Sequence, residues 1–391
     1  MNQIQKPDYK GKSIVNLMSS IIRSFDGEVM YKTLKTLPPE TIKKYKNVIL
    51  IVIDGLGYNY LKKKDSESKL NSYLQVKLTS VFPATTACAI STFFTGLAPQ
   101  QHAMTGWYIN LKEQGVVASI LRFTPRFGSC SLSDYGIKAK HVLDQKTVFE
   151  KIKAQSAIVT HKIITQSEFS RYVNQHSTIL TYETLKGFTR QIKKATISNN
   201  KRKYVYAYWG ELDHFNHEFG VGKKESEEHF KEIELEIEKL IQRLKNTNSL
   251  ILITSDHGFV NIPPKNNIMM EKHPKIQACL SAPLCGEGRA VYCYVHPDKA
   301  KEFERLVKKD FKNYCYLFKS QELVKKNFFG LFKPNAKLAD RIGDYTLICK
   351  DQHRIKDVIV QDKEKKKILP GHHGGVTEDE MFVPLIIIDC K

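Results

Sequence analysis

The sequence predicts an α/β protein built on a doubly wound, mostly parallel sheet with helices on both faces. Two observations indicate this fold class. Short apolar runs typical of strands buried on both faces recur along the chain, in residues 48–53, 204–208 and 250–254. From residue 146 onward, strand and helix patterns alternate, which is the order expected when helices cover both faces of a parallel sheet.

The composition is that of a globular protein, long enough for one large domain with an insertion or for two domains. The chain has 391 residues, 41% of them hydrophobic. No stretch reaches the roughly 18 uninterrupted apolar residues of a membrane span. Apolar residues at helical spacing over 14–25 predict an amphipathic core helix rather than a signal peptide. Eight cysteines without a CxxC pair are typical of reduced core thiols. We therefore expect a cytoplasmic protein.

The chain is strongly basic, with a formal net charge of +20. Such a charge attracts small anionic substrates, nucleic acid or acidic lipid. The sequence shows no basic motif interleaved with aromatic residues of the kind that recognises nucleic acid, so a lysine-rich solvated surface explains the charge equally well. Nucleic acid stays open as a partner, and the sequence does not indicate an oligomeric state.

The pattern divides the chain into three parts. Residues 1–277 are predicted to form the first part of the main core, with a helix over 58–73, an irregular segment over 108–145 and a long helix over 223–245. Residues 278–350 are predicted to form a small α+β insertion, in which the strands AVYCYV and DYTLIC flank a helix. Residues 351–391 return to the core with a GHHGG loop and a final apolar strand.

Three predicted strands each deliver an aspartate at or just beyond the carboxyl end: Asp54, Asp213 and Asp256. Ligand sites of open α/β sheets lie at this edge. Asp213 and His217 are four residues apart, so one helical turn would direct both at one ion. A lone aspartate after a strand is more often a cap or turn residue, but the ordered repetition favours a functional site.

Histidines complete this set. His257 directly follows Asp256, and the GHHGG loop offers His372 or His373. Carboxylates and imidazoles in this combination are suited to a pair of Zn²⁺ ions, with Mn²⁺ or Fe as the alternative metals. The histidines outside these motifs, among them His102, are expected to be surface or hydrogen-bonded core residues.

Thr85 and Thr86 are predicted at the N-terminus of a helix that follows Pro83. A hydroxyl there lies beside unpaired backbone N–H groups and the positive end of the helix dipole, which favour a phosphate or an alkoxide. Taken alone, a threonine at this position is most often an ordinary N-cap.

The series VIDGLG, TSVFPATTA…TG, ELDHFNH, TSDHG and HGG, in this order over residues 46–391, resembles the alkaline phosphatase superfamily and specifically its nucleotide pyrophosphatase/phosphodiesterase branch. The resemblance implies an alkaline-phosphatase-like fold and hydrolysis of phosphodiester or pyrophosphate bonds of nucleotide-like substrates. It implies one zinc ion held by Asp213, His217 and His373. It implies a second held by Asp54, Asp256, His257 and the nucleophile.

The position of the family's nucleophile relative to the TG that ends its motif selects Thr86, with Thr85 in reserve. The resemblance implies that Thr86 attacks phosphorus and forms a covalent phosphothreonine intermediate. His373 is chosen over His372 because the family's ligand directly precedes glycine.

Three candidate substrate-binding positions are less well matched. Ala87 stands where eukaryote-like members carry an aromatic residue that packs on the nucleobase, and Trp107 stands where they place an asparagine that holds a phosphate oxygen. Tyr208 matches an aromatic residue that stacks on the base, although a core strand residue would fit the pattern equally. Phosphoester chemistry is therefore better supported than a nucleotide substrate. The alternatives are a phosphomonoesterase of the same superfamily and a non-catalytic polyanion-binding protein on this fold.

Overall fold

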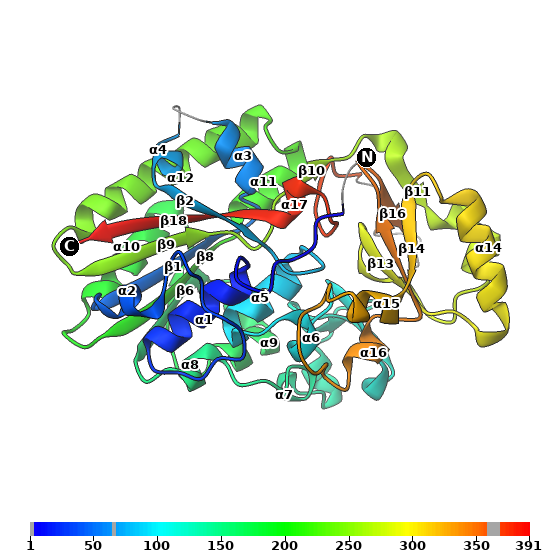
Figure 1. Cartoon of the computed structure of the whole chain (residues 1–391), viewed down its shortest axis with the longest axis horizontal. Coiled ribbons are helices and arrows are strands. Elements are labelled where there is room, and N and C mark those ends of the chain that lie inside the picture. The colour runs from blue at the N-terminus through cyan, green and yellow to red at the C-terminus, as the bar shows by residue number, and fades with distance from the viewer. Residues whose placement is uncertain (1–3, 65–67, 358–367) are drawn as a thin grey trace.

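The computed structural model describes residues 4–64, 68–357 and 368–391. A seven-stranded sheet forms the centre of the larger part of the molecule (Figure 1). Its strands, in spatial order, are β2 (Leu74–Thr79), β18 (Phe382–Cys390), β9 (Ser249–Thr254), β1 (Asn47–Ile53), β8 (Lys203–Trp209), β6 (Gln155–His161) and β7 (Thr178–Tyr182). Parallel pairing joins β9, β1, β8, β6 and β7, whereas β18 runs antiparallel to β9 and β2. The predicted doubly wound, mostly parallel sheet is confirmed.

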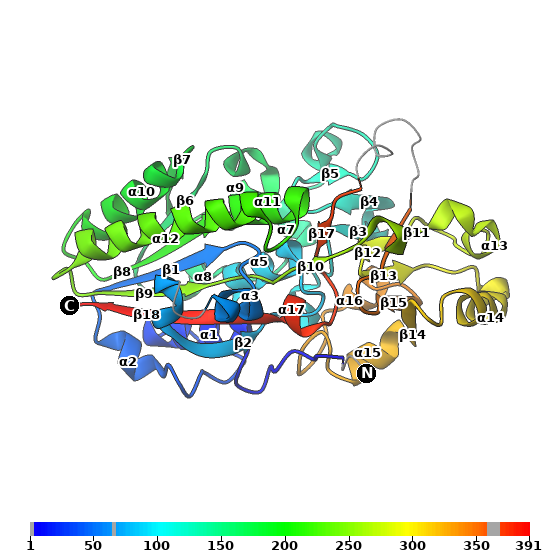
Figure 2. The ribbon, with the colours of Figure 1, turned by 90° about the horizontal axis from the view of Figure 1, so that it is seen from above.

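Helices cover both faces of this sheet (Figure 2). One face packs against α1 (Ile14–Ser24), α5 (Thr86–Thr95) and α8 (Val148–Lys151). The other packs against α10 (Leu185–Ile197), α11 (Glu211–Phe219) and α12 (Lys224–Leu244). Because both faces are covered, residues 48–53 of β1 are all fully buried, which explains their uninterrupted apolar sequence. The predicted amphipathic helix near the start and the long helix over 223–245 are both confirmed as α1 and α12.

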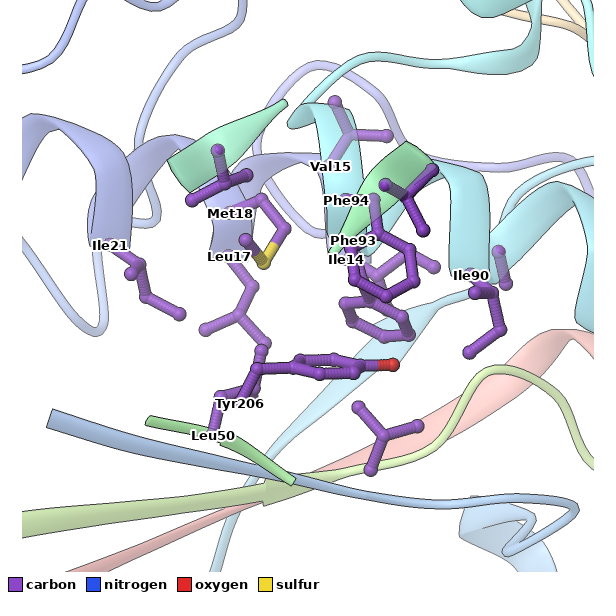
Figure 3. Close-up of a cluster of buried hydrophobic side chains, with 14 of the residues drawn as sticks. Ile14, Val15, Leu17, Met18, Ile21, Leu50, Ile90, Phe93, Phe94 and Tyr206 are labelled. Carbon is purple, nitrogen blue, oxygen red and sulfur yellow. The ribbon is translucent and has the colours of Figure 1, made fainter. Parts of the chain in front are cut away.

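The core beneath α1 and α5 is closely packed (Figure 3). Met18 of α1 and Phe93 of α5 meet Leu50 of β1 and Tyr206 of β8 in one buried cluster. The rings of Phe94 and Tyr206 lie 5.1 Å apart between centroids. Burial of such large side chains contributes about 1.5–3 kcal/mol each, so this cluster anchors α5 against the sheet.

A second seven-stranded sheet lies beside the first. Its spatial order is β14 (Cys315–Lys319), β15 (Tyr345–Cys349), β13 (Ala290–Cys293), β12 (Cys285–Glu287), β3 (Tyr108–Leu111), β4 (Val116–Ser119) and β5 (Thr124–Pro125). The predicted strands AVYCYV and DYTLIC are confirmed as β13 and β15, and the helix between them is α14 (Ala300–Asp310). Residues 108–125 were predicted to be irregular, and this was wrong: they add three strands to the same sheet. The division of the chain at 278 and 350 stays a prediction.

The remaining elements are short. The helices are α2 (Pro39–Lys43), α3 (Tyr58–Lys63), α4 (Lys69–Ser72), α6 (Pro99–His102), α7 (Ala139–Val142), α9 (Glu168–Val173), α13 (Pro274–Gln277), α15 (Ser320–Lys325), α16 (Leu338–Arg341) and α17 (Glu378–Met381). The strands are β10 (Val260–Asn261), β11 (Asn267–Met269), β16 (Arg354–Lys356) and β17 (Gly371–His372). The single helix predicted over 58–73 is two helices, α3 and α4, and residues 65–67 between them lie outside the described residues. Within the described ranges, no helix is long and apolar enough to cross a bilayer.

Candidate metal centre and nucleophile

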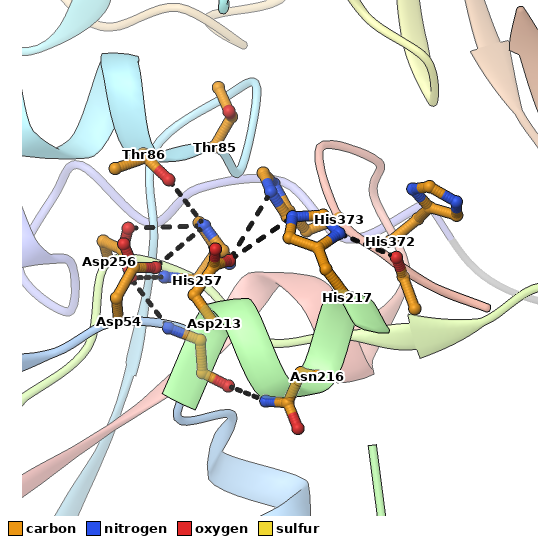
Figure 4. Close-up of polar contacts among 12 residues, drawn as sticks. Asp54, Thr85, Thr86, Asp213, Asn216, His217, Asp256, His257, His372 and His373 are labelled. Atoms are coloured by element: carbon orange, nitrogen blue, oxygen red, sulfur yellow. Dashed lines mark hydrogen bonds and ion pairs between the residues drawn. The ribbon is translucent and has the colours of Figure 1, made fainter. Parts of the chain in front are cut away.

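The predicted aspartates meet at one edge of the main sheet because their strands are neighbours. β9, β1 and β8 are parallel and adjacent, so their carboxyl ends lie together. Asp54 follows β1, Asp256 follows β9, and Asp213 lies in the first turn of α11, which begins after β8. Figure 4 shows these three side chains directed toward one centre.

Histidines surround the same centre. His217 lies one turn after Asp213 in α11, as predicted, with its Nε2 3.5 Å from Asp213 Oδ1. His373 approaches on the loop after β17, with its Nε2 3.8 Å from the same oxygen. β17 itself packs tightly on α11: a Cβ on Gly371, its first residue, would lie 1.9 Å from the carbonyl oxygen of Asn216. Only glycine allows that approach.

All three candidate histidines orient their rings in the same way. Each directs Nδ1 at a backbone carbonyl oxygen, at 2.8 Å from His217 to Gly371, 3.1 Å from His257 to Gly258 and 3.3 Å from His373 to Ala84. A carbonyl oxygen only accepts hydrogen bonds, so Nδ1 carries the ring proton in each case. Nε2 therefore carries the lone pair of each ring and faces the centre, which is the orientation of metal-binding histidines.

The carboxylate oxygens that face these nitrogens are also acceptors without a donor. Asp54 Oδ1, Asp213 Oδ1 and Asp256 Oδ2 are buried and have no hydrogen-bond partner among the described residues. His257 Nε2 lies 3.3 Å from both Asp54 Oδ1 and Asp256 Oδ2. Buried polar atoms are almost always paired. Carboxylate oxygens that face histidine Nε2 lone pairs, with no proton between them, therefore indicate positions for cations.

The electrostatics of the cluster lead to the same conclusion. Burial raises the pKa of Asp54 well above its usual range, and the charges of Asp256 and Asp213 raise it further. Burial raises the pKa of Asp213 too, with added repulsion from Asp256 and Glu287. Desolvation and like charge both disfavour carboxylates that lack a counter-ion. A divalent cation reverses both effects.

The histidines are held in the neutral form that binds metal. Burial lowers the pKa of His217 to about 4 and also lowers the pKa of His257. Burial lowers the pKa of His373 well below its usual value, and its neighbours His257 and His217 lower it further. The ligand atoms form two groups, and within each group all atoms lie within 4.8 Å of one another. One group is Asp213, His257 and His373, and the other is Asp54, Asp256 and His257. His257 lies between them, and His217 joins the first through Asp213.

The two threonines differ in what their hydroxyls contact. Thr86 is the first residue of α5, and its Oγ1 lies 3.2 Å from His257 Nε2 at the cluster. Thr85 is the N-cap residue, but its side chain makes no capping bond and instead donates to Glu287 Oε1 at 2.6 Å. The structure therefore brings Thr86, and not Thr85, to the candidate metal ligands.

The two histidines of the GHHGG loop differ in the same way. His373 joins the cluster, whereas His372 Nε2 lies 2.9 Å from the carbonyl oxygen of Leu369 and contacts Arg354. Burial lowers the pKa of His372 to about 2, with the charge of Arg354 adding to the effect. His372 therefore directs Nε2 away from the cluster, and His373 is the ligand candidate.

A model of the type I phosphodiesterase/nucleotide pyrophosphatase family matches residues 48–379. The chain belongs to this family. It is accordingly a metal-dependent phosphoric ester hydrolase. No curated protein matches the chain in a direct search.

Several solved structures share the fold of this chain. The inactive threonine-to-alanine form of murine ectonucleotide pyrophosphatase/phosphodiesterase 5 in complex with AMP is 16% identical, with a TM-score of 0.64 over 86% of this chain and 87% of that chain. The human ectonucleotide pyrophosphatase/phosphodiesterase 5 is 16% identical, with a TM-score of 0.65 over 87% of each chain. Phosphonoacetate hydrolase from Sinorhizobium meliloti is 15% identical, with a TM-score of 0.61 over 88% and 90%. These likenesses confirm the alkaline-phosphatase-like fold.

A cavity of about 510 Å³ opens beside the candidate centre of this phosphodiesterase-family protein. We call it the side cavity, which runs from Thr86 past Ile90 and Phe94 of α5 to α9. Two of the three predicted substrate-binding residues, Trp107 and Tyr208, line it. The Tyr208 hydroxyl donates a hydrogen bond to Asp54.

The third predicted substrate-binding residue, Ala87, is placed differently. Ala87 is fully buried within α5, so its side chain is not available to a substrate. Its backbone N–H lies in the first turn of the helix, where N–H groups lack an intrahelical acceptor. That N–H is the group of Ala87 that stays a substrate-binding candidate.

Glu287 of β12 lies at this site and was not predicted from the sequence. Its Oε1 accepts hydrogen bonds from Thr85 Oγ1 at 2.6 Å and from the backbone N–H of Trp107 at 3.0 Å. Burial raises the pKa of Glu287 to about 7, against the opposite effect of these two bonds. Glu287 ends a three-residue strand and has no fixed spacing from the metal motifs, so no pattern in the sequence distinguishes it from a surface glutamate.

Proposed function

We propose that the protein hydrolyses phosphodiester or pyrophosphate bonds with two Zn²⁺ ions and a covalent phosphothreonine at Thr86. One observation carries the proposal: unprotonated histidine Nε2 atoms face buried carboxylate oxygens that lack partners among the described residues. A cation between them would satisfy both, and zinc prefers such mixed nitrogen and oxygen ligands. The family description names nucleotides, so nucleotide esters are the first substrates to test.

The ligands divide into two sets around His257. Asp213, His217 and His373 would hold one ion, and Asp54, Asp256, His257 and Thr86 would hold the other. Mn²⁺ or Fe would suit the same donors. When bound, two divalent cations supply the positive charge that stabilises an alkoxide nucleophile and the oxygen of the leaving group.

The chain itself positions the nucleophile. Thr86 is the first residue of α5, so the positive end of the helix dipole favours negative charge on its hydroxyl oxygen. The backbone N–H groups of Thr86 and Ala87, which have no intrahelical acceptor, would donate to the non-bridging phosphate oxygens. Thr86 Oγ1 forms a bond to phosphorus as the bond to the leaving alcohol or phosphate breaks. Water then cleaves the phosphothreonine and releases the remaining phosphomonoester.

The test compares bis-p-nitrophenyl phosphate with p-nitrophenyl phosphate, on chelated protein before and after addition of Zn²⁺. We expect zinc-restored activity that favours the diester. Thr86→Ala should abolish turnover while it keeps the bound zinc, and Thr85→Ala should keep measurable turnover and still form a phosphoenzyme. The inactive threonine-to-alanine form of the murine relative supports this expectation.

Three results would contradict the proposal. Wild-type turnover in Thr86→Ala would refute the nucleophile. Preference for the monoester would make the protein a phosphomonoesterase, and polyanion binding without any hydrolysis would make it a binding protein on this fold.

A further inference from the structure

The side cavity continues from the candidate catalytic residues into a mainly apolar space. Asp54, Thr86 and Asp213 lie at one end of it. Farther from them the walls are formed by buried side chains of α5, β6 and α9, among them Ile90, Ile158, Phe169 and Val173. A phosphoester whose phosphorus lies at Thr86 would therefore place one ester group against branched aliphatic and aromatic walls.

The charge in this cavity is sparse for so basic a protein. The chain has 61 lysine and arginine residues, yet Arg122 is the one cation among the described residues that line the cavity. Its guanidinium lies 5.5 Å from the centre of the Trp107 ring. The carboxylates that line the cavity are the candidate ligands Asp54 and Asp213. A polyphosphate tail would find little matching charge here, since recognition of several phosphates needs several cations.

The mouth of the cavity is also apolar. Ile163 and Ile164 line it and are 70% and 38% exposed to solvent. Two adjacent exposed isoleucines at the entrance of a pocket extend its apolar wall to the surface, which is typical of a binding site rather than of scattered surface residues. A group that extends out of the cavity would cover them, whereas a compact polar group would not.

One buried hydroxyl in the cavity wall lacks a hydrogen-bond partner in the described part of the chain. Tyr206 lines the cavity, is 2% exposed, and its hydroxyl has no hydrogen-bond partner among the described residues. Figure 3 shows its ring extending from β8 toward Ile90. Buried tyrosine hydroxyls usually find a partner, so a bound molecule with an acceptor oxygen would supply the missing one.

We infer that the side cavity takes an apolar ester group, an alkyl or acyl chain, and that the substrate class is a phosphodiester with an apolar tail. This inference rests on the proposed function, because it assumes that phosphorus binds at Thr86. The competing occupant is a nucleoside, for which Thr160, Gln166 and Asn174 on one wall would provide polar contacts.

The test uses four p-nitrophenyl phosphodiesters with the zinc-loaded full chain: the methyl, hexyl and decyl esters, each below its critical micelle concentration, and the thymidine 5′-ester. Burial of a methylene favours binding by up to about fourfold. We expect kcat/KM to rise at least about tenfold from methyl to decyl. The thymidine ester should fall below the decyl ester.

The exposed mouth allows a variant that leaves the core intact. The double variant Ile163→Asp/Ile164→Asp should lower the decyl-to-methyl ratio of kcat/KM several-fold, because charge at the entrance opposes entry of an apolar chain. Ile179→Asp is the matched control. Ile179 of β7 is 43% exposed and does not line the cavity, so its substitution should leave the ratio unchanged.

The outcomes separate this inference from the proposed function. A flat dependence on chain length, with Thr86-dependent hydrolysis of the methyl ester, would overturn the inference and leave the proposed function standing. Preference for the thymidine ester would overturn it in favour of a nucleoside. Failure to hydrolyse any ester, the methyl ester included, would refute the proposed function and the inference with it.

Discussion

Glu287 provides a quantitative test of how the second sheet supports catalysis. Its Oε1 accepts hydrogen bonds from Thr85, which precedes the candidate nucleophile, and from Trp107 of the cavity wall. Glu287→Ala removes both bonds, and a displacement of about 1 Å at a reacting group costs about 100-fold in rate. We therefore expect kcat to fall about 100-fold in Glu287→Ala. Glu287→Gln keeps an acceptor oxygen and should stay within about tenfold of wild type.

The raised pKa of Glu287 predicts a second, independent effect on stability. In the metal-free protein, burial raises the pKa of the Glu287 carboxyl from 4.5 in the unfolded chain to about 7 in the folded state. The folded state therefore binds the carboxyl proton more tightly than the unfolded state does. The contribution to the free energy of unfolding is therefore present below pH 4.5 and is lost as pH rises through 7. At about 1.4 kcal/mol per pKa unit, the loss is at most about 3 kcal/mol. Because the side chain is only half-buried, solvent reduces this figure.

Steady-state kinetics of the zinc-loaded protein measure the loss of kcat. Urea unfolding of the chelated protein at pH 5 and pH 7.5 measures the effect of Glu287 on stability. Glu287→Gln should be more stable than wild type at pH 7.5 and lose that advantage at pH 5. Glu322→Gln, at an exposed position of α15, is the matched control. Equal losses of kcat in the alanine and glutamine variants would refute the role of the hydrogen bonds. A difference in unfolding free energy that does not change with pH would refute the buried-charge argument.

Two further predictions concern stability. Burial lowers the pKa of His102 to about 3, so the unfolded state binds the proton first as pH falls below 6.5. The free energy of unfolding should drop by about 3 kcal/mol between pH 6.5 and 4.5, and His102→Gln should flatten that part of the urea-unfolding profile. Glu380 pairs with Arg289, and both are fully buried. In thermal unfolding, Glu380→Ala should lower the free energy of unfolding by about 3–5 kcal/mol, because it leaves the buried charge of Arg289 unpaired. The double variant Arg289→Met/Glu380→Leu should recover most of that loss. Equal losses in the single and double variants would contradict an unpaired buried charge as the cause.

The main sheet was predictable because its central strands are buried on both faces. Their sequences are continuous apolar runs, and the aspartates that follow them identify the functional edge. The part of the second sheet from residues 108–125 was not predictable. β3, β4 and β5 have four residues or fewer, and β3 and β4 mix half-buried with buried positions. The pairing of β3 with β12 joins segments far apart in the chain, which local patterns do not reveal.

The candidate site was predictable in its ligands but not in its supports. Asp213 and His217 follow from helical spacing alone, and the structure confirms that α11 places them on one face. The choice between Thr85 and Thr86 depended on a family resemblance, since both lie at the same helix end. The two threonines are distinguished by Glu287, which accepts a hydrogen bond from Thr85 across 202 positions in the sequence. Such contacts depend on the folded path of the chain and leave no local pattern.

The hairpin formed by β12 and β13 connects the second sheet to both sides of the candidate centre. Glu287 on its first strand accepts hydrogen bonds from Thr85, which precedes the candidate nucleophile, and from Trp107. Arg289, two residues later, pairs with Glu380 through two bonds, and Glu380 Oε1 also accepts the N–H of Gly375 at 2.7 Å. Gly375 lies two residues after His373, so the same hairpin also holds the loop that carries this histidine. The second sheet therefore acts as a structural part of the candidate active site, because a shift of this hairpin would move Thr86 and His373 together.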